Sequence, residues 1–170
     1  IGMLGVFASQ NLFLFFLFFE LTLIPMFFLI GKWGYLDREK AAYSFLIYNG
    51  LGSAVLLIAF VTLFVHFRTL NIDELSYIMQ MVQGPEAERF KWGILIAFLI
   101  AFGVKLPIFP LHSWMLRVHV QAPPAIVMLH SGILLKIGAY GLIVFGLGFF
   151  PEQFAQIAPL LAILGVINLL

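Results

Sequence analysis

The sequence predicts an all-α membrane protein, a polytopic bundle of transmembrane helices, from two observations. First, 63% of its 170 residues are hydrophobic and only 10% are charged, and the mean hydropathy is +1.09. An ordinary soluble domain is about half apolar and about a quarter charged, so too little polar surface remains here to cover a water-soluble fold. Second, the apolar residues form continuous runs long enough to cross a bilayer as helices, without the alternation that a membrane β-barrel requires.

The composition also excludes several classes of function. Low charge with high hydropathy excludes intrinsic disorder, and a formal net charge of only +1 excludes a basic nucleic-acid-binding protein. The absence of cysteine excludes a disulfide framework, a thiolate zinc site, an iron–sulfur cluster and a cysteine nucleophile. We therefore expect the lipid bilayer as a partner, no nucleic acid, and no bound metal or cofactor in this chain.

We expect a single membrane domain over residues 1–170, and a fragment of a larger protein, because both ends of the sequence lie in apolar runs. The run 1–31 is too long for one crossing, so we place a break at its only polar cluster, residues 9–11. The expected complete spans are about 11–31, 41–67, 92–112 and 123–148, and the expected partial spans are 1–8 and 155–170. Residues 32–40 and 113–122 are expected to be loops.

The polar connection 68–91 contains one helical pattern. Asn71 can cap a short helix, and Gly84-Pro85 would end it. The apolar residues with helical spacing on one face are Leu75, Ile78, Met79 and Val82. This pattern predicts a short amphipathic helix lying in the membrane interface, although a plain surface connector remains open.

Three charged residues lie inside the expected spans, whereas all the others lie in loops or at span edges. Glu20 and Lys136 lie at the midpoints of 11–31 and 123–148, and Lys105 lies 13 residues after Trp92. Each such charge costs roughly 2.5–3.5 kcal/mol at the bilayer centre, so these side chains must face protein, water or one another. A charge pair that joins helices would satisfy one Glu and one Lys, but a second Lys leaves an odd charge. A Lys whose charged form is favoured by a carboxylate and disfavoured by burial can switch its protonation state, which is the chemistry of a proton relay.

The third span predicts a discontinuous helix next to Lys105. Pro107 and Pro110 each remove a backbone donor and disfavour helix in the residue before them. A broken helix at membrane depth is tolerated only where it is buried in protein or lines a hydrated cavity, although a simple proline kink is the alternative. His112 follows Lys105 by seven residues and would share its face if the helix resumed.

The fourth span adds further polar groups. Lys136 and Tyr140 share a helix face, while His130 points elsewhere and is either part of a proton route or a buried histidine with satisfied hydrogen bonds. The glycines expected to allow close helix approach are Gly132, Gly138 and Gly141. His119 falls in the expected loop 113–122, and we assign it no role.

Three segments resemble the antiporter-like membrane chains of respiratory complex I. Residues 19–26, Phe-Glu-Leu-Thr-Leu-Ile-Pro-Met, resemble the glutamate helix of that family. Residues 102–114 are similar to its broken lysine helix, and 121–141 to the lysine helix that follows. The likeness is closest to the M-type chain of bacterial NADH:quinone oxidoreductase and covers essentially the whole sequence. His130 is more similar to the L-type chain and to the multisubunit Na⁺/H⁺ antiporters.

This resemblance implies a fourteen-helix proton-translocating subunit of the bacterial cytoplasmic membrane, of which this sequence would be the middle of the first inverted repeat. It implies that Glu20 pairs with Lys105, that Lys105 is the protonatable pump residue, and that Lys136 passes protons on, with His112 and His130 in the hydrated route. NADH, FMN, iron–sulfur clusters and quinone would belong to partner subunits, and this chain would hold no redox centre.

Two alternatives stay open. The same helices also build a subunit of a multisubunit Na⁺/H⁺ antiporter. A structural membrane scaffold could instead use the three charges only to hold helices together.

Overall fold

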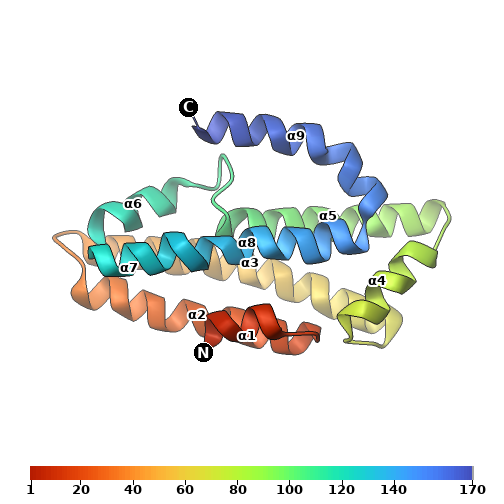
Figure 1. Ribbon diagram of the computed structural model, residues 1–170, viewed down its shortest axis with the longest axis horizontal. Helices are drawn as coiled ribbons and strands as arrows, with labels where there is room; N and C mark the ends of the chain where they lie inside the picture. The colour runs from red at the N-terminus through yellow and green to blue at the C-terminus, as the bar shows by residue number, and fades with distance from the viewer. Residues whose placement is uncertain (170) are drawn as a thin grey trace.

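Long helices dominate the computed structural model, which describes residues 1–169 (Figure 1). The separate helices are α1 (Gly2–Ala8), α2 (Leu12–Trp33), α3 (Arg38–Phe67), α4 (Ile72–Met81), α5 (Pro85–Lys105), α6 (Ser113–Gln121) and α9 (Pro151–Leu169). Between α6 and α9 runs one continuous helix, Pro124–Leu147, made of α7 (Pro124–Leu129), the π-helical turn η1 (His130–Leu134), α8 (Leu135–Gly141) and the π-helical turn η2 (Leu142–Leu147). The predicted fold class, an all-helical membrane bundle, is confirmed.

The break predicted at residues 9–11 is present and has a structural role. The side chain of Asn11 caps α2 by accepting a hydrogen bond from the backbone N–H of Phe13 at 2.9 Å. The same segment forms an isolated antiparallel bridge, in which Leu12 N–H donates to the Leu70 carbonyl at 2.8 Å and Ile72 N–H donates to the Gln10 carbonyl at 3.1 Å. The start of α2 is therefore tied to the start of α4.

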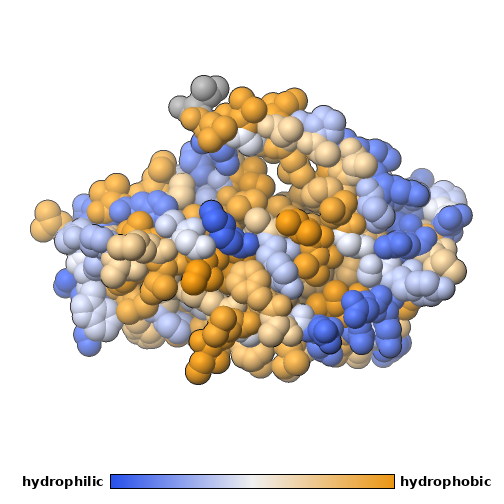
Figure 2. Space-filling model, in the orientation of Figure 1, coloured by the Kyte–Doolittle hydropathy of each residue, from blue (hydrophilic) through white to orange (hydrophobic). Residues whose placement is uncertain are grey.

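An aromatic cluster fills the centre of the bundle, where α2, α3, α5 and η2 meet. The ring of Phe145 in η2 lies 4.8 Å from that of Phe15, 5.2 Å from that of Phe60 and 5.7 Å from that of Phe102, measured between centroids. All four rings are buried. Such aromatic pairs contribute about 0.5–1.5 kcal/mol each beyond the area they bury. On the face that Figure 2 shows, most of the middle of the bundle is apolar and hydrophilic residues are more frequent toward the two ends, as expected for a body surrounded by lipid or by other membrane helices.

Among residues 1–169, four helices are long and apolar enough to cross a membrane: α2, α3, Pro124–Leu147 and α9. Three of them correspond to expected complete spans, and α9 covers the region where we expected a partial one; Leu170 lies outside the described residues. The expected span at 92–112 has no single counterpart. Helix α5 starts at Pro85, carries Glu86, Glu88, Arg89 and Lys91 in its first two turns, and ends at Lys105.

The connection between α3 and α5 contains the amphipathic helix that the sequence predicted. The Oδ1 atom of Asn71 caps α4 by accepting from the N–H groups of Asp73 at 2.9 Å and Glu74 at 3.4 Å. Leu75 and Met79 are buried on its inner face, whereas Tyr77 is exposed. The prediction of a loop at 113–122 was wrong, because residues 113–121 form α6. Its buried residues Trp114 and Val118 are four apart, and this helical spacing was visible in the sequence.

Candidate functional site

Lys105 is the last residue of α5 and lies inside the bundle with only 2% of its surface exposed. Its Nζ donates a hydrogen bond to Oγ1 of Thr22 on α2 at 3.3 Å and lies 4.1 Å from the centroid of the Phe19 ring. The Thr22 hydroxyl itself donates to the Phe19 carbonyl at 2.7 Å. The ammonium group is thus held by one neutral oxygen and one aromatic face, an arrangement that stabilises a cation less than a carboxylate does.

Glu20 does not form an ion pair with Lys105. Within residues 1–169 no carboxylate oxygen lies within 4.0 Å of the Lys105 Nζ. Glu20 is half-buried, and its Oε1 is enclosed without a hydrogen-bond partner in the described part of the chain. The functional pairing of Glu20 with Lys105 that the resemblance implied therefore stays a prediction.

The chain after Lys105 leaves the helix, as the two prolines predicted. Residues 106–112 form turns, in which Ile108 N–H donates to the Gly103 carbonyl at 2.9 Å. Asn168 on α9 satisfies two further backbone groups of this segment: it accepts from Phe109 N–H at 3.0 Å and donates to the Pro107 carbonyl at 3.2 Å. An interrupted helix at membrane depth requires such substitute partners.

Lys136 lies on the exposed face of α8, away from the buried Lys105 side chain. The helix that carries it packs tightly on α5, because a Cβ added to Gly138 would come within 2.7 Å of the Leu106 backbone N, and one added to Gly141 would collide with the Phe102 ring. These two glycines have the predicted role. Gly132 does not, since a Cβ there would meet nothing within 4 Å.

His112 does not share a helix face with Lys105, because the helix does not resume before Ser113. It precedes α6 as the N-cap residue and is half-buried, and its Nδ1 is enclosed without a hydrogen-bond partner among the described residues. Its ring lies 5.6 Å from that of Phe109, between centroids. The condition under which His112 would share a face with Lys105, a helix that resumes directly after the prolines, is therefore not met.

His130 is fully buried, and its partner is a residue that the sequence did not single out. Its Nδ1 lies 3.1 Å from Nε2 of His119 on α6, while its own Nε2 is enclosed without a partner in the described chain. The helix changes to π-helical geometry at His130, a feature that is frequent at functional sites. The only sequence signal for His119 was the helical spacing that predicts α6.

Trp114 lies between the end of α5, which carries Lys105, and the buried ring of His130. Its Nε1 donates to the Val104 carbonyl at 3.1 Å, next to Lys105, and its ring packs edge-on against the His130 ring at 5.5 Å between centroids. The residue is 1% exposed. It therefore holds α6 against the end of α5 and fixes one side of the space around His130.

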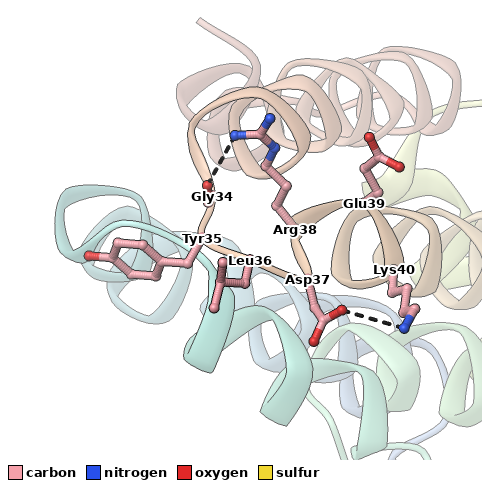
Figure 3. A pocket seen from close by; sticks show the side chains of 7 residues that line it. All are labelled: Gly34, Tyr35, Leu36, Asp37, Arg38, Glu39 and Lys40. Carbon is pink, nitrogen blue, oxygen red and sulfur yellow. Dashed lines mark hydrogen bonds and ion pairs between the residues drawn. The ribbon is translucent and has the colours of Figure 1, made fainter.

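Other features do not join this site. A surface hollow of about 560 Å³ is lined by seven consecutive residues from Gly34 to Lys40 (Figure 3), where Asp37 pairs with Lys40 at 3.4 Å. Its side chains from Tyr35 to Lys40 are exposed, and it shares no residue with the Lys105 site. In residues 1–169 no group of three or more His, Cys, Asp or Glu side chains is arranged to hold a metal ion.

Comparisons with known proteins identify the family of the chain. A family described as NADH:quinone oxidoreductase/Mrp antiporter, TM matches residues 9–170. The chain belongs to this family. The resemblance to its M-type, antiporter-like chains is therefore confirmed.

Two relatives illustrate the match. NADH-quinone oxidoreductase subunit M of Escherichia coli (strain K12) is 40% identical over 174 residues, which cover 99% of this chain and 34% of that protein. NAD(P)H-quinone oxidoreductase chain 4 of Gloeobacter violaceus is 42% identical over 171 residues, covering 99% of this chain and 31% of that protein. The chain thus spans about a third of the length of the curated relatives it matches.

Solved structures of the NADH:quinone oxidoreductase/Mrp antiporter family have the same helix arrangement. Respiratory complex I from Thermus thermophilus with bound NADH contains a chain that matches with a TM-score of 0.78 and 29% identity, over 94% of this chain and 33% of that one. The Mrp complex from Dietzia sp. DQ12-45-1b matches with a TM-score of 0.73 and 24% identity, over 89% of this chain and 28% of that one, which supports the shared fold alone.

Proposed function

We propose that this chain is part of the M-type membrane subunit of a proton-translocating NADH:quinone oxidoreductase, located in the bacterial cytoplasmic membrane. Glu20, Lys105 and Lys136, with His112 and His130, would form its proton relay. NADH, FMN, iron–sulfur clusters and quinone would be bound by partner subunits. The family, the relatives named subunit M and chain 4, and the likeness to complex I support this assignment.

The observation that carries the relay is the environment of Lys105. A buried lysine that has no carboxylate within 4.0 Å in the described chain, and only the Thr22 hydroxyl as an acceptor, is held weakly in its charged form. Approach of the Glu20 carboxylate would stabilise the ammonium form, and its withdrawal would release the proton. A small movement between α2 and α5 is then enough to load and unload Lys105.

We infer the proton routes on either side of Lys105 from the positions of His130 and Lys136. His130, with an unpartnered Nε2 inside the bundle and His119 at its Nδ1, can pass a proton between α6 and the interior around Lys105. We include His119 in the relay on this geometry. Lys136 faces outward from α8, so it would exchange protons with groups beyond the described residues.

One proton can pass through the pair of His119 and His130 without any other group, because one ring takes up a proton as the other releases one. A proton arriving at Nδ1 of His119 lets its Nε2–H move to Nδ1 of His130, and His130 then releases the proton on its Nε2 inward. Both rings end as the other neutral tautomer and are reset by rotation. The 3.1 Å separation between the two nitrogens is already that of a hydrogen bond.

A subunit of a Na⁺/H⁺ antiporter would differ from the proposed subunit in its partner chains, which would lack reductase activity, and in transporting Na⁺ as well as H⁺. The full-length protein should be tagged, purified with its partners from its own membrane and reconstituted in proteoliposomes. The proposal expects co-purified NADH:quinone reductase activity, and proton uptake that needs NADH and quinone and continues without Na⁺. A complex without reductase activity that exchanges Na⁺ for H⁺ would contradict it and support the antiporter.

The scaffold alternative concerns Lys105 itself. A lysine that only joins helices should be required for assembly, whereas a relay lysine should be dispensable for assembly and essential for proton movement. The unpaired state of Lys105 favours the relay, because a structural charge pair would place the carboxylate against the ammonium.

A further inference from the structure

Lys91 lines two neighbouring cavities. Their lining residues lie at the end of the bundle where α4 meets the first turns of α5 and α9, and Figure 1 shows these helices. The polar cavity measures about 520 Å³ and the second about 410 Å³. The polar cavity is lined by Met79, Gln80, Gln83, Glu88, Lys91, Phe149, Pro151, Glu152 and Gln153. The second shares Lys91, Met79 and Gln83 with it. Its other lining residues are His66, Phe67, Val82, Glu86, Ala87 and Phe90, so it combines an apolar wall with one carboxylate and one imidazole.

Lys91 lines both cavities and has no protein partner in the part of the chain that the structure describes. It is 7% exposed, no carboxylate oxygen lies within 4.0 Å of its Nζ, and the described hydrogen bonds do not include it. The stem of Lys91 is buried, while its Nζ opens into the cavity space, where an anion or water supplies its hydrogen bonds.

The acidic groups of the polar cavity are held apart from Lys91. Gln153 is 2% exposed and donates from Nε2 to both carboxylate oxygens of Glu88, at 3.1 and 3.0 Å. Glu152 lines the same cavity. One cation and two carboxylates that are not paired with each other therefore face a common space, which suits a ligand carrying both charges.

The surroundings place these cavities at a membrane–water boundary. The first turns of α5 are charged, whereas the rest of the helix is apolar up to Lys105. The amphipathic helix α4 lies beside them with Tyr77 exposed, and Trp92 follows Lys91 on α5. Amphipathic helices and Tyr and Trp side chains are typical of the headgroup region.

We propose that these two cavities form a binding site for a zwitterionic aminophospholipid of the phosphatidylethanolamine type. Lys91 would bind the phosphate, Glu88 and Glu152 would accept hydrogen bonds from the primary ammonium, and the cavity with Phe67, Val82 and Phe90 would take the apolar part next to the glycerol. An anionic lipid would leave the carboxylates facing its phosphate, and a choline headgroup has no N–H donor for them. The site is independent of the proton relay.

The test uses the complete purified complex, delipidated and then incubated with equal amounts of phosphatidylethanolamine, phosphatidylglycerol and phosphatidylcholine. Native mass spectrometry would count the lipids retained by the wild type and by Lys91→Met, with Lys40→Met as a matched change of an exposed lysine. Because Lys91→Met removes the hydrogen bonds between the ammonium and the phosphate, it is expected to reduce phosphatidylethanolamine retention at this site by roughly tenfold or more. Lys91→Arg should restore it.

A second variant tests the ammonium end of the site. Glu88→Gln should retain lipid but lose the preference for phosphatidylethanolamine over phosphatidylcholine, and Glu152→Gln should show the same change if Glu88→Gln does not assemble. Equal phosphatidylethanolamine retention in the wild type and Lys91→Met would overturn the proposal. Electron-microscopy density showing protein rather than lipid beside Lys91 in the whole complex would overturn it as well.

Discussion

The Nζ atom of Lys105 lies 3.3 Å from the Oγ1 atom of Thr22, so the lysine at the end of α5 is bound by a neutral hydroxyl of α2. Thr22 and Glu20 are two residues apart on the same helix and therefore point to different sides of it. Because the hydroxyl is already oriented by its bond to the Phe19 carbonyl, it offers an oxygen lone pair to the lysine whether or not Glu20 approaches. Thr22 can thus hold the ammonium group while the carboxylate is withdrawn.

Removing this hydroxyl should impair proton movement. Thr22→Val leaves Lys105 without its acceptor, an unsatisfied buried donor that is expected to cost about 1–3 kcal/mol, or roughly five- to hundredfold in the rate of coupled turnover. Thr22→Ser keeps the oxygen and should retain most of the activity. NADH-driven proton uptake by reconstituted complexes measures both, and equal rates for the Val and wild-type proteins would show that Thr22 has no part in the relay.

The two histidines should behave as one unit. His119→Gln and His130→Asn each keep a polar atom near the contact but cannot pass a proton, and loss of one proton-transfer group typically reduces a rate by about 10²–10⁴-fold. If the rings act in series, the double variant should turn over no more slowly than the slower single variant. If the rate losses of the two single variants multiply in the double variant, His119 and His130 have separate roles.

Gly138 should be essential for packing α8 on the break after Lys105. Gly138→Ala places a Cβ about 2.7 Å from the Leu106 backbone N and is expected to destabilise the folded complex, since overpacking typically costs about 1–3 kcal/mol. Gly132→Ala on the same continuous helix meets nothing within 4 Å and should be neutral or slightly stabilising. Thermal unfolding of the detergent-solubilised complexes compares them; equal midpoints for the two variants would argue against the close α8–α5 contact.

Asn168 should protect the backbone amides of residues 106–112 from hydrogen exchange. Asn168→Ala removes one donor and one acceptor from the backbone of this segment and should accelerate amide exchange at Phe109 by about tenfold, the equivalent of roughly 1.4 kcal/mol for lost hydrogen bonding. Gln156→Ala, an exposed residue of the same helix α9, is the control. Hydrogen–deuterium exchange measured by mass spectrometry would show the difference, and unchanged exchange after Asn168→Ala would contradict the proposed capping of this segment.

The sequence predicted those parts of the fold that depend on local rules. Apolar runs, the polar break at residues 9–11, the Asn71 cap and the prolines after Lys105 each have a local physical cause, and the structure has a corresponding feature at each of them. The helix α6 was missed although its buried residues Trp114 and Val118 have helical spacing, because the segment lies between two expected spans. The pairing of His119 with His130 depends on how α6 folds back against η1, which no local pattern specifies.

Whether each charged residue of the spans is buried or exposed depends on tertiary packing. Depth along a span was enough to single out Glu20, Lys105 and Lys136, since each lies within an apolar run. It could not distinguish the buried Lys105 from the exposed Lys136, because that difference depends on which helix face packs against α5. The π-helical turn η1, which shifts the helix register between His130 and Lys136, likewise has no signature in the periodicity.

The most direct test of the relay compares Lys105→Ala with the wild type in the complete complex reconstituted in proteoliposomes. Assembly would be measured by native electrophoresis, and proton uptake per NADH oxidised by a pH-sensitive dye. We predict a complex that assembles fully but has lost proton uptake and, with it, coupled turnover. A fully assembled Lys105→Ala complex that pumps protons at the wild-type rate would contradict the account.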